Sequence, residues 1–524
     1  MAALGALLTL ALPPVGWWPL ALTLAGLFAA VANARAGSRA FRLGFWFALP
    51  FFAIYISWLP RSFADLLGPS FWSVFPFLVL ALAAMWGATT WLAWLAAGGG
   101  GRRTLWLLPV ALVALEWART QGYFAFPWGT LGYLWLETPV AQLASLFGVY
   151  GLSLLVTVLA ALLALPLVSP RTGGYEPGAV RLLLAPAAAL LLLAGSFVVG
   201  ANMLPGASGE DPGALAKARP YTALLVQGNV DAFGRLSAAG QDLDTHLRIT
   251  RDAVRLRATS ELLPYDLVVW PEGAVLGYEL DGPGSEQLLE LIGAAAPGSS
   301  IIVGGRRYEQ NRSYNTLMAL QDGEALDSYD KHYLVPFGER WPFLESLPGL
   351  YRTIFSALGL PMLAGTSAGA APAPLTTAIG EVGAFICYES VFPQVQRAQV
   401  GLGARLLVLS TNDAWFARGA GGRQHFDMGR MRAIETRRWL LRAGNDGITA
   451  TVDPYGRVTA ELERRVAGSL TTSFDLRDDL TPWVRYGRLT IWLLGGYLVV
   501  VTSLLQRIRP RERNRVSERV RRRA

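Results

Sequence analysis

The sequence predicts a polytopic α-helical membrane protein with about eight spans that carries one extracytoplasmic α/β domain. Hydrophobic residues make up 52% of the 524 residues and charged residues only 16%, a far more apolar balance than in an average soluble protein. Long apolar runs fill residues 1–204, whereas short β-rich runs alternate with helical stretches across 220–487. The chain therefore combines a membrane part with a second domain of different character.

Apolar runs in the N-terminal part are candidate membrane spans, because a helix needs about 20 apolar residues to cross a bilayer. They lie at 3–12, 17–33, 43–59, 71–97, 104–117, 139–167 and 181–203. An eighth run, RLTIWLLGGYLVVVTSLL, lies at 488–505. We therefore divide the chain into an N-terminal transmembrane domain (1–204), a linker (205–219), an α/β domain (220–487), a C-terminal span (488–506) and a basic tail (507–524).

Arginines in the short loops set the predicted orientation. The loops after the second, fourth and sixth spans hold Arg35, Arg39, Arg42, Arg102, Arg103, Arg171 and Arg181. The alternate loops hold only Arg61 and Arg119. Because basic residues collect on the cytoplasmic side, we expect both termini in the cytoplasm and residues 205–487 on the outer face. The arginine-rich tail is then a topology anchor, and no nucleic-acid partner is expected.

The α/β domain is expected to bury its strands on both faces. Its apolar runs are TALLVQ, DLVVW, SIIVGG, NTLMAL, VGAFIC, RLLVLS and GITATV. Helical stretches lie between several of them, near 240–260, 284–295 and 424–442. Continuous apolar strands that alternate with helices are typical of sheets covered by helices.

Two residue types are almost absent, which draws attention to the few that remain. Cys387, in GAFICYES, is the only cysteine, and Lys217 and Lys331 are the only lysines among 46 basic residues. One thiol excludes an internal disulfide framework, and three scattered histidines offer no metal cluster, so neither metal nor cofactor is expected. Lys217 lies in the linker, but Lys331 does not, and an ammonium has a tunable pKa that a guanidinium lacks.

Three segments of the α/β domain carry reactive side chains near predicted strand ends. DLVVW runs into Glu272, VGAFIC ends on Cys387, and YDKHYLVPFGE carries Lys331 and Glu339. In α/β sheets such groups gather in a crevice beyond the strands. A carboxylate could then take the thiol proton, and a cation could stabilise thiolate and oxyanion. Each residue alone also has a structural interpretation, as a buried thiol or a solvated charge.

These motifs resemble a known family. WPEGA, YDKHYLVPFGE and ICYES match, in order and spacing, the Glu, Lys and Cys motifs of the nitrilase-like carbon–nitrogen hydrolase superfamily. The whole chain is similar to the apolipoprotein N-acyltransferase family of bacterial membrane enzymes, also through LLVQGNV and STNDAWF. The resemblance implies an α-β-β-α sandwich and the bacterial inner membrane. It implies acyl transfer, usually from phosphatidylethanolamine, to the α-amine of diacylglyceryl-cysteine on apolipoproteins.

The resemblance also implies roles for single residues. Glu272 would be the general base, Lys331 the transition-state stabiliser and Cys387 the nucleophile. The supporting residues would be Glu339, Tyr388 and Glu389, with the backbone N–H of Tyr388 as an oxyanion donor. Residues expected to contact substrate, for which core packing is the alternative, are Trp341, Phe343, Asn412, Trp415 and Phe416.

Some features leave alternatives open. Leu236 stands where some family members carry a tryptophan, and Ala417 stands where a glycine is usual. A membrane-tethered amidase would use the same triad with water as the attacking group. A non-catalytic lipid- or lipoprotein-binding protein would need no triad. Glu116 and Arg119, at the end of a span, are either functional or a pair that snorkels to the interface.

Overall fold

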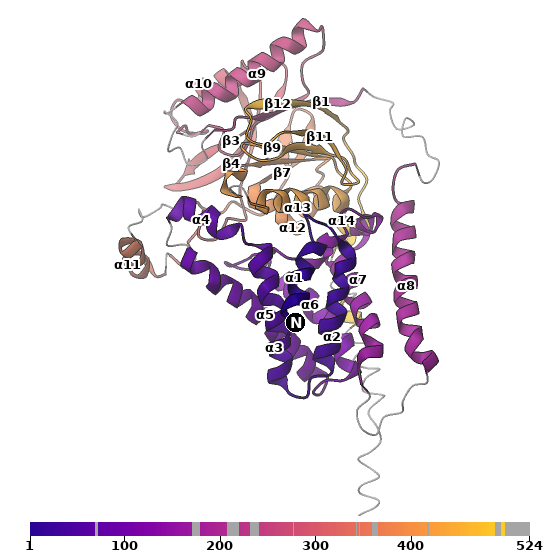
Figure 1. The fold of residues 1–524 in the computed structure, drawn as a ribbon. Helices are drawn as coiled ribbons and strands as arrows, with labels where there is room; N and C mark the ends of the chain where they lie inside the picture. Colours follow the sequence, from indigo (N-terminus) through magenta and orange to yellow (C-terminus); the bar gives the residue numbers. More distant parts are fainter. Residues whose placement is uncertain are drawn as a thin grey trace, which may run out of the picture.

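The computed structural model describes residues 1–68, 72–169, 179–206, 219–230, 240–275, 277–341, 343–344, 346–358, 365–416, 419–487 and 494–497. In it, a helical N-terminal part and a two-sheet domain pack one above the other (Figure 1). Leu236, Ala417, most of the predicted linker, most of the predicted C-terminal span and the basic tail lie outside these residues.

The first sheet has six strands in the order β12-β1-β2-β3-β4-β5. They are β1 (Tyr221–Gln227), β2 (Leu267–Val269), β3 (Ser300–Glu309), β4 (Arg312–Gln321), β5 (Glu324–Asp330) and β12 (Gly468–Phe474). Strands β1, β2 and β3 are parallel, and the other pairings are antiparallel. Helices α9 (Gln241–Thr259) and α10 (Ser285–Gly293) cover the outer face of this sheet through a shared apolar core.

The second sheet has the order β11-β10-β9-β8-β7-β6. Its strands are β6 (Leu375–Thr377), β7 (Gly380–Ile386), β8 (Leu406–Thr411), β9 (Leu440–Gly444), β10 (Thr449–Val452) and β11 (Val458–Leu462). Helices α12 (Pro393–Gly401) and α13 (Gly421–Thr436) cover its outer face, and a common core that includes Leu225, Ile386 and Val408 fills the space between the sheets. The predicted α-β-β-α sandwich is therefore confirmed.

The N-terminal part is a bundle of helices. They are α1 (Ala2–Leu8), α2 (Thr23–Ala32), α3 (Gly37–Tyr55), α4 (Leu59–Leu67), α5 (Val74–Ala96), α6 (Arg102–Ala118), α7 (Ala144–Ala164) and α8 (Ala179–Asn202), with short 3₁₀ turns between them. Each of the seven predicted N-terminal runs contains helix, whereas α4 was not predicted. Three described segments are long and apolar enough to cross a membrane, namely Val74–Ala96, Pro139–Leu167 and Leu183–Asn202.

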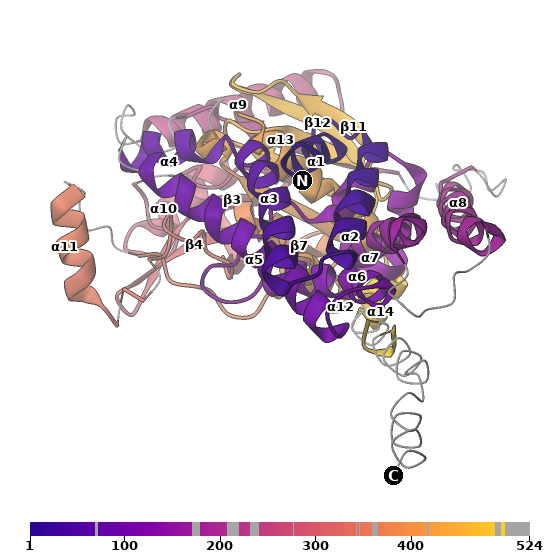
Figure 2. The same cartoon turned by 60° about the horizontal axis from the view of Figure 1, so that its bottom comes forward.

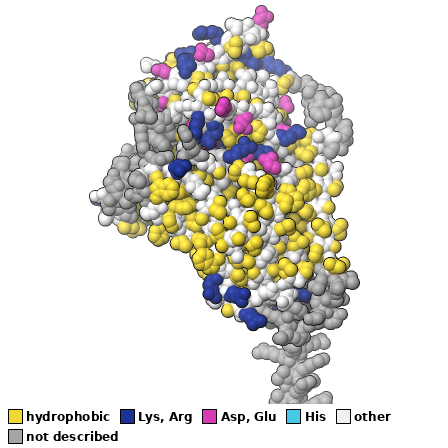
Figure 3. Space-filling model, viewed as in Figure 1, with side chains coloured by type: hydrophobic (Ala, Val, Ile, Leu, Met, Phe, Trp, Pro, Cys, Tyr) yellow, Lys and Arg dark blue, Asp and Glu magenta, His cyan; other side chains and the backbone are white. Residues whose placement is uncertain are grey.

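The surface of the bundle is apolar. Figure 3 shows hydrophobic side chains gathered over the helical part, with basic side chains above and below this band. Exposed members on the long helices include Phe77, Leu92 and Leu191. Such a broad apolar surface is typical of contact with lipid. Helix α8 stands at one side of the molecule and α11 (Pro348–Leu358) at the other (Figure 1 and Figure 2).

One predicted helix ends earlier than expected. The stretch 424–442 was expected to be helical throughout, but α13 ends at Thr436. Arg437 adopts a left-handed backbone conformation with φ of 53°, which terminates the helix. The chain then enters β9 at Leu440, parallel to β8. Pairing with a buried neighbouring strand thus overrides the helical pattern of the sequence at this end.

The bundle and the sandwich share an interface along α13 and α14 (Pro482–Tyr486). The backbone N–H of Val149 donates to Glu435 Oε1 at 2.8 Å, and Trp58 Nε1 donates to Gln424 Oε1 at 2.9 Å. Gly148, inside α7, has a φ of 68°, and a Cβ there would lie 2.9 Å from the ring of Trp483. Gly148 therefore allows both the kink in α7 and the close approach of α14.

Gly148→Ala tests this packing. The added methyl group would meet the Trp483 ring and the residue would keep an unfavourable φ, so we expect a loss of about 1–3 kcal/mol in stability. Gly195→Ala in α8, where nothing lies within 4 Å, serves as the control and should be neutral or slightly stabilising. Thermal unfolding in detergent measures both variants, and equal midpoints for the two would contradict the prediction.

Candidate active site

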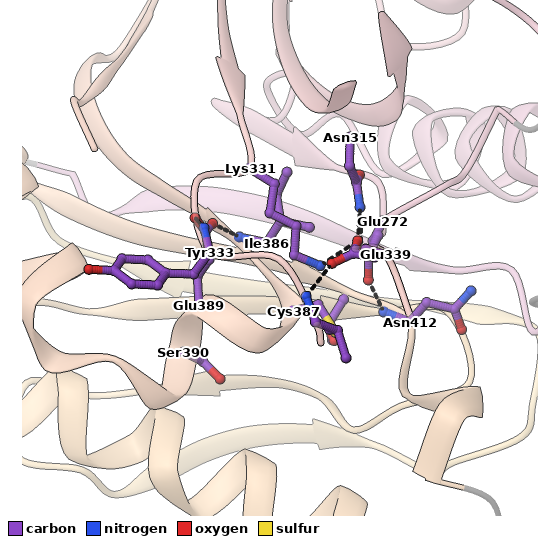
Figure 4. A network of polar contacts seen from close by, with 12 residues as sticks. Glu272, Asn315, Lys331, Tyr333, Glu339, Ile386, Cys387, Glu389, Ser390 and Asn412 are labelled. Atoms are coloured by element: carbon purple, nitrogen blue, oxygen red, sulfur yellow. Dashed lines mark hydrogen bonds and ion pairs between the residues drawn. The ribbon is translucent and has the colours of Figure 1, made fainter. Parts of the chain in front are cut away.

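The three predicted catalytic residues come together from both sheets. Glu272 follows β2 and Lys331 follows β5 in the first sheet, whereas Cys387 follows β7 in the second. Figure 4 shows Glu272, Lys331, Glu339 and Cys387 side by side in the space where the strand ends meet. The sandwich thus brings together residues that are up to 115 positions apart in the chain.

Lys331 is the centre of a buried charge cluster. Its side chain is 1% exposed, and Nζ lies 3.2 Å from Glu272 Oε1 and 2.9 Å from Glu339 Oε1. Asn315 Nδ2 donates to the same two oxygens, at 2.8 and 3.0 Å. Burial alone would lower the pKa of Lys331, but the two carboxylates raise it above its ordinary value. Lys331 is therefore a permanent cation at neutral pH.

Both oxygens of the Glu272 carboxylate have fixed partners. Oε1 contacts Lys331 and Asn315, while Oε2 accepts the backbone N–H of Asn412 at 2.9 Å. These contacts hold the carboxylate in one orientation beside Cys387. A fixed carboxylate next to a thiol is the arrangement that a general base requires.

Cys387 is a buried thiol held in an unusual backbone conformation. Its φ is 48°, in the left-handed region, directly after β7. Burial raises the pKa of Cys387, Glu272 raises it further, and Lys331 lowers it. The net direction is upward, so the resting group is a thiol rather than a thiolate. If Cys387 acts as a nucleophile, it therefore needs a base to remove its proton.

Glu389 connects the loop of Lys331 to the loop of Cys387. Its Oε1 accepts from the hydroxyl of Tyr329 and the backbone N–H of His332, both at 2.8 Å, and from the N–H of Tyr333 at 3.2 Å. Its Oε2 accepts from the N–H of Ile386 at 2.8 Å. Burial raises the pKa of Glu389, but these donors favour the carboxylate. Glu389 is fully buried and orients the two catalytic loops.

Tyr388 connects the site to the helical bundle. Its hydroxyl donates to the backbone carbonyl of Ala125 at 2.6 Å, and its ring stacks on Trp128 with centroids 5.9 Å apart. Ala125 and Trp128 belong to the loop that follows α6. The tyrosine side chain thus shapes the wall of the site rather than entering the charge cluster.

A cavity of about 530 Å³ opens onto these residues. From the sandwich its wall includes Glu272, Asn315, Lys331, Glu339, Trp341, Cys387, Tyr388, Asn412, Trp415 and Phe416. From the helical bundle it includes Trp58, Leu59, Ser62, Val74, Phe75, Leu78, Phe124, Phe126 and Trp128. Polar groups cluster at the thiol and apolar side chains form most of the remaining wall, so the cavity suits an apolar chain that ends in a reactive group.

The predicted substrate contacts divide into two groups. Trp341, Asn412, Trp415 and Phe416 line the cavity. Phe343 is not part of this lining; it is 50% exposed, and its ring lies 5.3 Å from that of Tyr123. The predicted contact of Phe343 with substrate therefore stays a prediction, and it would have to be made outside the cavity.

Several residues of the site were missed by sequence reasoning. Asn315 opens the run NTLMAL, and a polar residue at the start of an apolar strand was the only signal it gave. Trp58, Phe126 and Trp128 come from predicted spans or loops, where aromatic residues are common at membrane interfaces. Their contact with the catalytic residues depends on how the bundle packs against the sandwich.

Glu116 and Arg119 are both buried and secure the loop that carries Trp128. Glu116 Oε1 accepts the N–H of Leu131 at 2.8 Å, and Arg119 Nη1 donates to the carbonyl of Trp128 at 2.8 Å. The Arg119 guanidinium also lies over the ring of Phe52. Burial argues against a pair that snorkels to the surface, and these contacts give the pair a part in shaping the cavity.

The raised pKa of Cys387 can be tested by alkylation. We expect iodoacetamide to modify Cys387 more slowly at neutral pH than it modifies a free thiol, because little thiolate is present. The rate should keep increasing above about pH 8.5, the ordinary thiol pKa. Mass spectrometry of the intact protein reports the reaction without ambiguity, since there is one cysteine. A rate that is already constant across neutral pH would instead indicate a resting thiolate.

Glu389→Gln tests the connection between the two loops. The side-chain NH₂ of glutamine would face backbone N–H groups that now donate to the Glu389 carboxylate, and two donors cannot pair. We therefore expect a loss of about 1–3 kcal/mol in stability. We also expect slower modification of Cys387 by acyl donors. Glu381→Gln, at the half-buried start of β7, is the control. The unfolding midpoint and the rate of adduct formation should both be lower in Glu389→Gln than in Glu381→Gln. Equal values for the two variants would contradict the role of Glu389 in connecting the two loops.

Family models and relatives match nearly the whole chain. The model for the apolipoprotein N-acyltransferase N-terminal domain matches residues 4–162, and the carbon–nitrogen hydrolase model matches residues 222–483. A curated apolipoprotein N-acyltransferase from Azotobacter vinelandii strain DJ is 35% identical, over 96% of this chain and 94% of that protein. Another, from Pseudomonas aeruginosa strain UCBPP-PA14, is 31% identical over 98% of this chain and 96% of that protein.

Among solved structures, a carbon–nitrogen hydrolase from Helicobacter pylori G27 covers 52% of this chain and 95% of its own, with 15% identity and a TM-score of 0.39. The assignment depends on the relatives, because their similarity extends through both the helical part and the sandwich. The chain therefore belongs to the apolipoprotein N-acyltransferase family.

Proposed function

We propose that this protein transfers an acyl chain from a membrane phospholipid, through a thioester on Cys387, to the α-amine of diacylglyceryl-cysteine on apolipoproteins. One observation carries the proposal. The thiol and its charge cluster open into an apolar cavity whose wall comes partly from the helical bundle. Such a cavity accommodates a lipid chain next to the nucleophile. Phosphatidylethanolamine is the donor we expect, as in the family at large.

The first half of the reaction forms the thioester. Glu272 removes the proton from Cys387 Sγ, and the thiolate attacks the ester carbonyl carbon of the phospholipid. The carbonyl electron pair moves to oxygen, where Lys331 Nζ and the backbone N–H of Tyr388 stabilise the negative charge. When the carbonyl reforms, the glycerol oxygen leaves and takes the proton from Glu272. A lysophospholipid departs and the acyl chain remains on sulfur.

The second half passes the chain to the lipoprotein. The neutral α-amine attacks the thioester carbonyl and again places a negative charge on oxygen between the same donors. Glu272 takes the proton that the nitrogen loses, and the C–S bond breaks. The proton then returns to the sulfur, so the enzyme is regenerated. Splitting the transfer in this way replaces one difficult step by two easier ones.

The buried charges support this sequence of steps. Two carboxylates face one ammonium, so the cluster carries one excess negative charge when Cys387 is a thiol. Proton transfer to Glu272 moves that excess negative charge to the sulfur and creates a thiolate close to Lys331. Charge therefore moves within the cluster without any change in its total, which limits the desolvation penalty of the step.

The second candidate function is a membrane-tethered amidase, in which water would attack the thioester. The same triad serves both reactions, so the distinction depends on the cavity. Its wall from α4 and α5 is almost entirely apolar, which suits a long acyl chain and not a small amide. A non-catalytic binding protein would have no need to bury Lys331 between two carboxylates beside a thiol.

We also propose the membrane arrangement of the whole chain. Eight crossings, with 1–204 as the N-terminal transmembrane domain and 488–506 as the last span, would leave both termini in the cytoplasm of the inner membrane. Residues 220–487 would then face the outer side, where lipoproteins are completed. The arginine bias of the loops and the three long apolar helices support this arrangement.

Formation of the thioester is the decisive test. Incubation of the purified protein with phosphatidylethanolamine should add the mass of one acyl chain, and a diacylglyceryl peptide should then remove it. Cys387→Ala should give no adduct, and Glu272→Gln should slow its formation by about 10²–10⁴-fold. Acyl transfer to the peptide by Cys387→Ala would exclude the covalent mechanism. Release of free fatty acid without transfer to the peptide would favour the hydrolase.

A further inference from the structure

A second polar cluster lies directly behind the nucleophile. It consists of Ser390, Asp413, His425 and Arg442, each with 0% exposure. None of these four residues belongs to the lining of the cavity. They come from the segment after β7, the segment after β8, α13 and β9, so the cluster joins three neighbouring strands of the second sheet to the covering helix α13.

His425 is the centre of this cluster and contacts the nucleophile's own backbone. Its Nε2 lies 2.9 Å from the carbonyl oxygen of Cys387 and 2.7 Å from Ser390 Oγ. Its Nδ1 lies 3.1 Å from both Asp413 Oδ1 and Arg442 Nη2. The Ser-His-Asp order resembles a hydrolase triad. However, a fully buried Ser390 cannot meet a substrate, so the cluster must act through what it touches.

The contacts determine which imidazole nitrogen carries a proton. The carbonyl oxygen of Cys387 can only accept, so a 2.9 Å contact requires a hydrogen on His425 Nε2. In the other neutral tautomer the only ring hydrogen is on Nδ1, so the lone pair of Nε2 would face the carbonyl oxygen of Cys387, and neither atom could donate. At Nδ1, Asp413 Oδ1 can accept a hydrogen and Arg442 Nη2, which ion-pairs with Asp413, can donate one, so these partners accommodate Nδ1 with or without a hydrogen and leave Nε2 as the donor. The cluster therefore presents a fixed N–H donor to the Cys387 carbonyl.

This donor acts on the group that the mechanism uses. The carbonyl of Cys387 and the N–H of Tyr388 belong to one peptide unit, and the only cis peptide bond in the described chain is Pro13–Pro14. In a trans peptide the C=O and N–H point in opposite directions. A carbonyl held toward His425, behind the site, thus directs the Tyr388 N–H to the other side, where Cys387 and Tyr388 line the cavity.

The same contact strengthens the donor and holds its backbone. Hydrogen bonds in a chain polarise one another, so an N–H whose own carbonyl accepts a bond becomes a better donor. Cys387 has a φ of 48°, which is unfavourable for a residue with a side chain and persists only where neighbours impose it. His425 supplies one such restraint at the carbonyl, and Glu389 supplies another through the N–H of Ile386.

We propose that His425 is a positioning residue for acyl transfer, which donates Nε2–H to the Cys387 carbonyl and thereby directs and polarises the Tyr388 N–H as an oxyanion donor. Asp413 and Arg442 fix the imidazole in this orientation. The inference rests on the proposed function only in requiring an oxyanion at Cys387; it does not depend on which lipid or lipoprotein is used.

The test compares two reactions of the same thiol. Acylation by a p-nitrophenyl ester of a fatty acid passes through an oxyanion and releases coloured nitrophenol. Alkylation by iodoacetamide displaces iodide and forms no oxyanion. In His425→Leu we expect the acylation rate to fall about 10–100-fold, in line with the loss of part of one oxyanion donor. The alkylation rate should stay within about twofold, since the thiol, Glu272 and Lys331 are unchanged.

Two further substitutions keep the test valid if His425→Leu does not fold. Glutamine can place an N–H near the position of Nε2, whereas asparagine reaches only the position of Nδ1. We therefore expect His425→Gln to recover most of the acylation rate and His425→Asn to remain slow.

His246→Leu is the control. It removes a buried histidine of α9 whose Nδ1 contacts the carbonyl of Asp242, and it should leave the ratio of the acylation rate to the alkylation rate unchanged.

The outcomes separate the alternatives. If the acylation and alkylation rates fall equally in His425→Leu, the cluster only maintains the fold. If His425→Asn acylates as fast as His425→Gln, no donor is needed at the position of Nε2. Either result overturns the proposal. If the wild-type protein reacts with the nitrophenyl ester but not with phosphatidylethanolamine, the proposed lipid donor fails, while the role of His425 is still measured by the ratio of rates.

Discussion

The buried ammonium of Lys331 is the constraint on which the rest of the site depends. An isolated charge with 1% exposure would be strongly unfavourable, so partners must reach it from several directions. Glu272 and Glu339 do so, and Asn315 links the two carboxylates. Satisfying this one charge therefore fixes the ends of β2, β4 and β5 relative to each other. The catalytic geometry of the first sheet follows from the solvation of a single side chain.

The second sheet carries Cys387, so it must be held in a fixed position relative to Lys331 and Glu272 on the first sheet. Glu389 does this by accepting N–H groups from the loop of Lys331 and from Ile386, next to the nucleophile. Tyr388 extends the connection to the helical bundle through the carbonyl of Ala125. Tyr388 and Glu389, the two residues that follow Cys387, thus use their side chains to fix the positions of neighbouring segments. Their side chains join three parts of the molecule, while the proposed oxyanion donor is the backbone N–H of Tyr388.

Sequence reasoning predicted what local patterns encode. Continuous apolar strands gave β1, β3, β7 and β8, and the scarcity of lysine and cysteine singled out Lys331 and Cys387. It missed β5, whose mostly exposed residues give little apolar signal, although Lys331 directly follows this strand. Asn315 and His425 were missed as site residues because their roles arise from contacts across the fold. The end of α13 was misjudged because pairing of β9 with β8 overrides helical periodicity.

The two halves of the molecule contribute different properties to one cavity. The sandwich supplies the charged groups that line the cavity beside the thiol, and Glu272 and Glu339 among them are constrained by the charge of Lys331. The bundle supplies apolar side chains such as Trp58, Phe75 and Leu78, which satisfy no buried charge. Under the proposed function, changes in this wall would therefore alter which acyl chains fit while the acid–base chemistry persists. The proposal thus assigns selectivity for the acyl chain and competence for the reaction to separate parts of the sequence, and the contact of Tyr388 with Ala125 is one of those that join them.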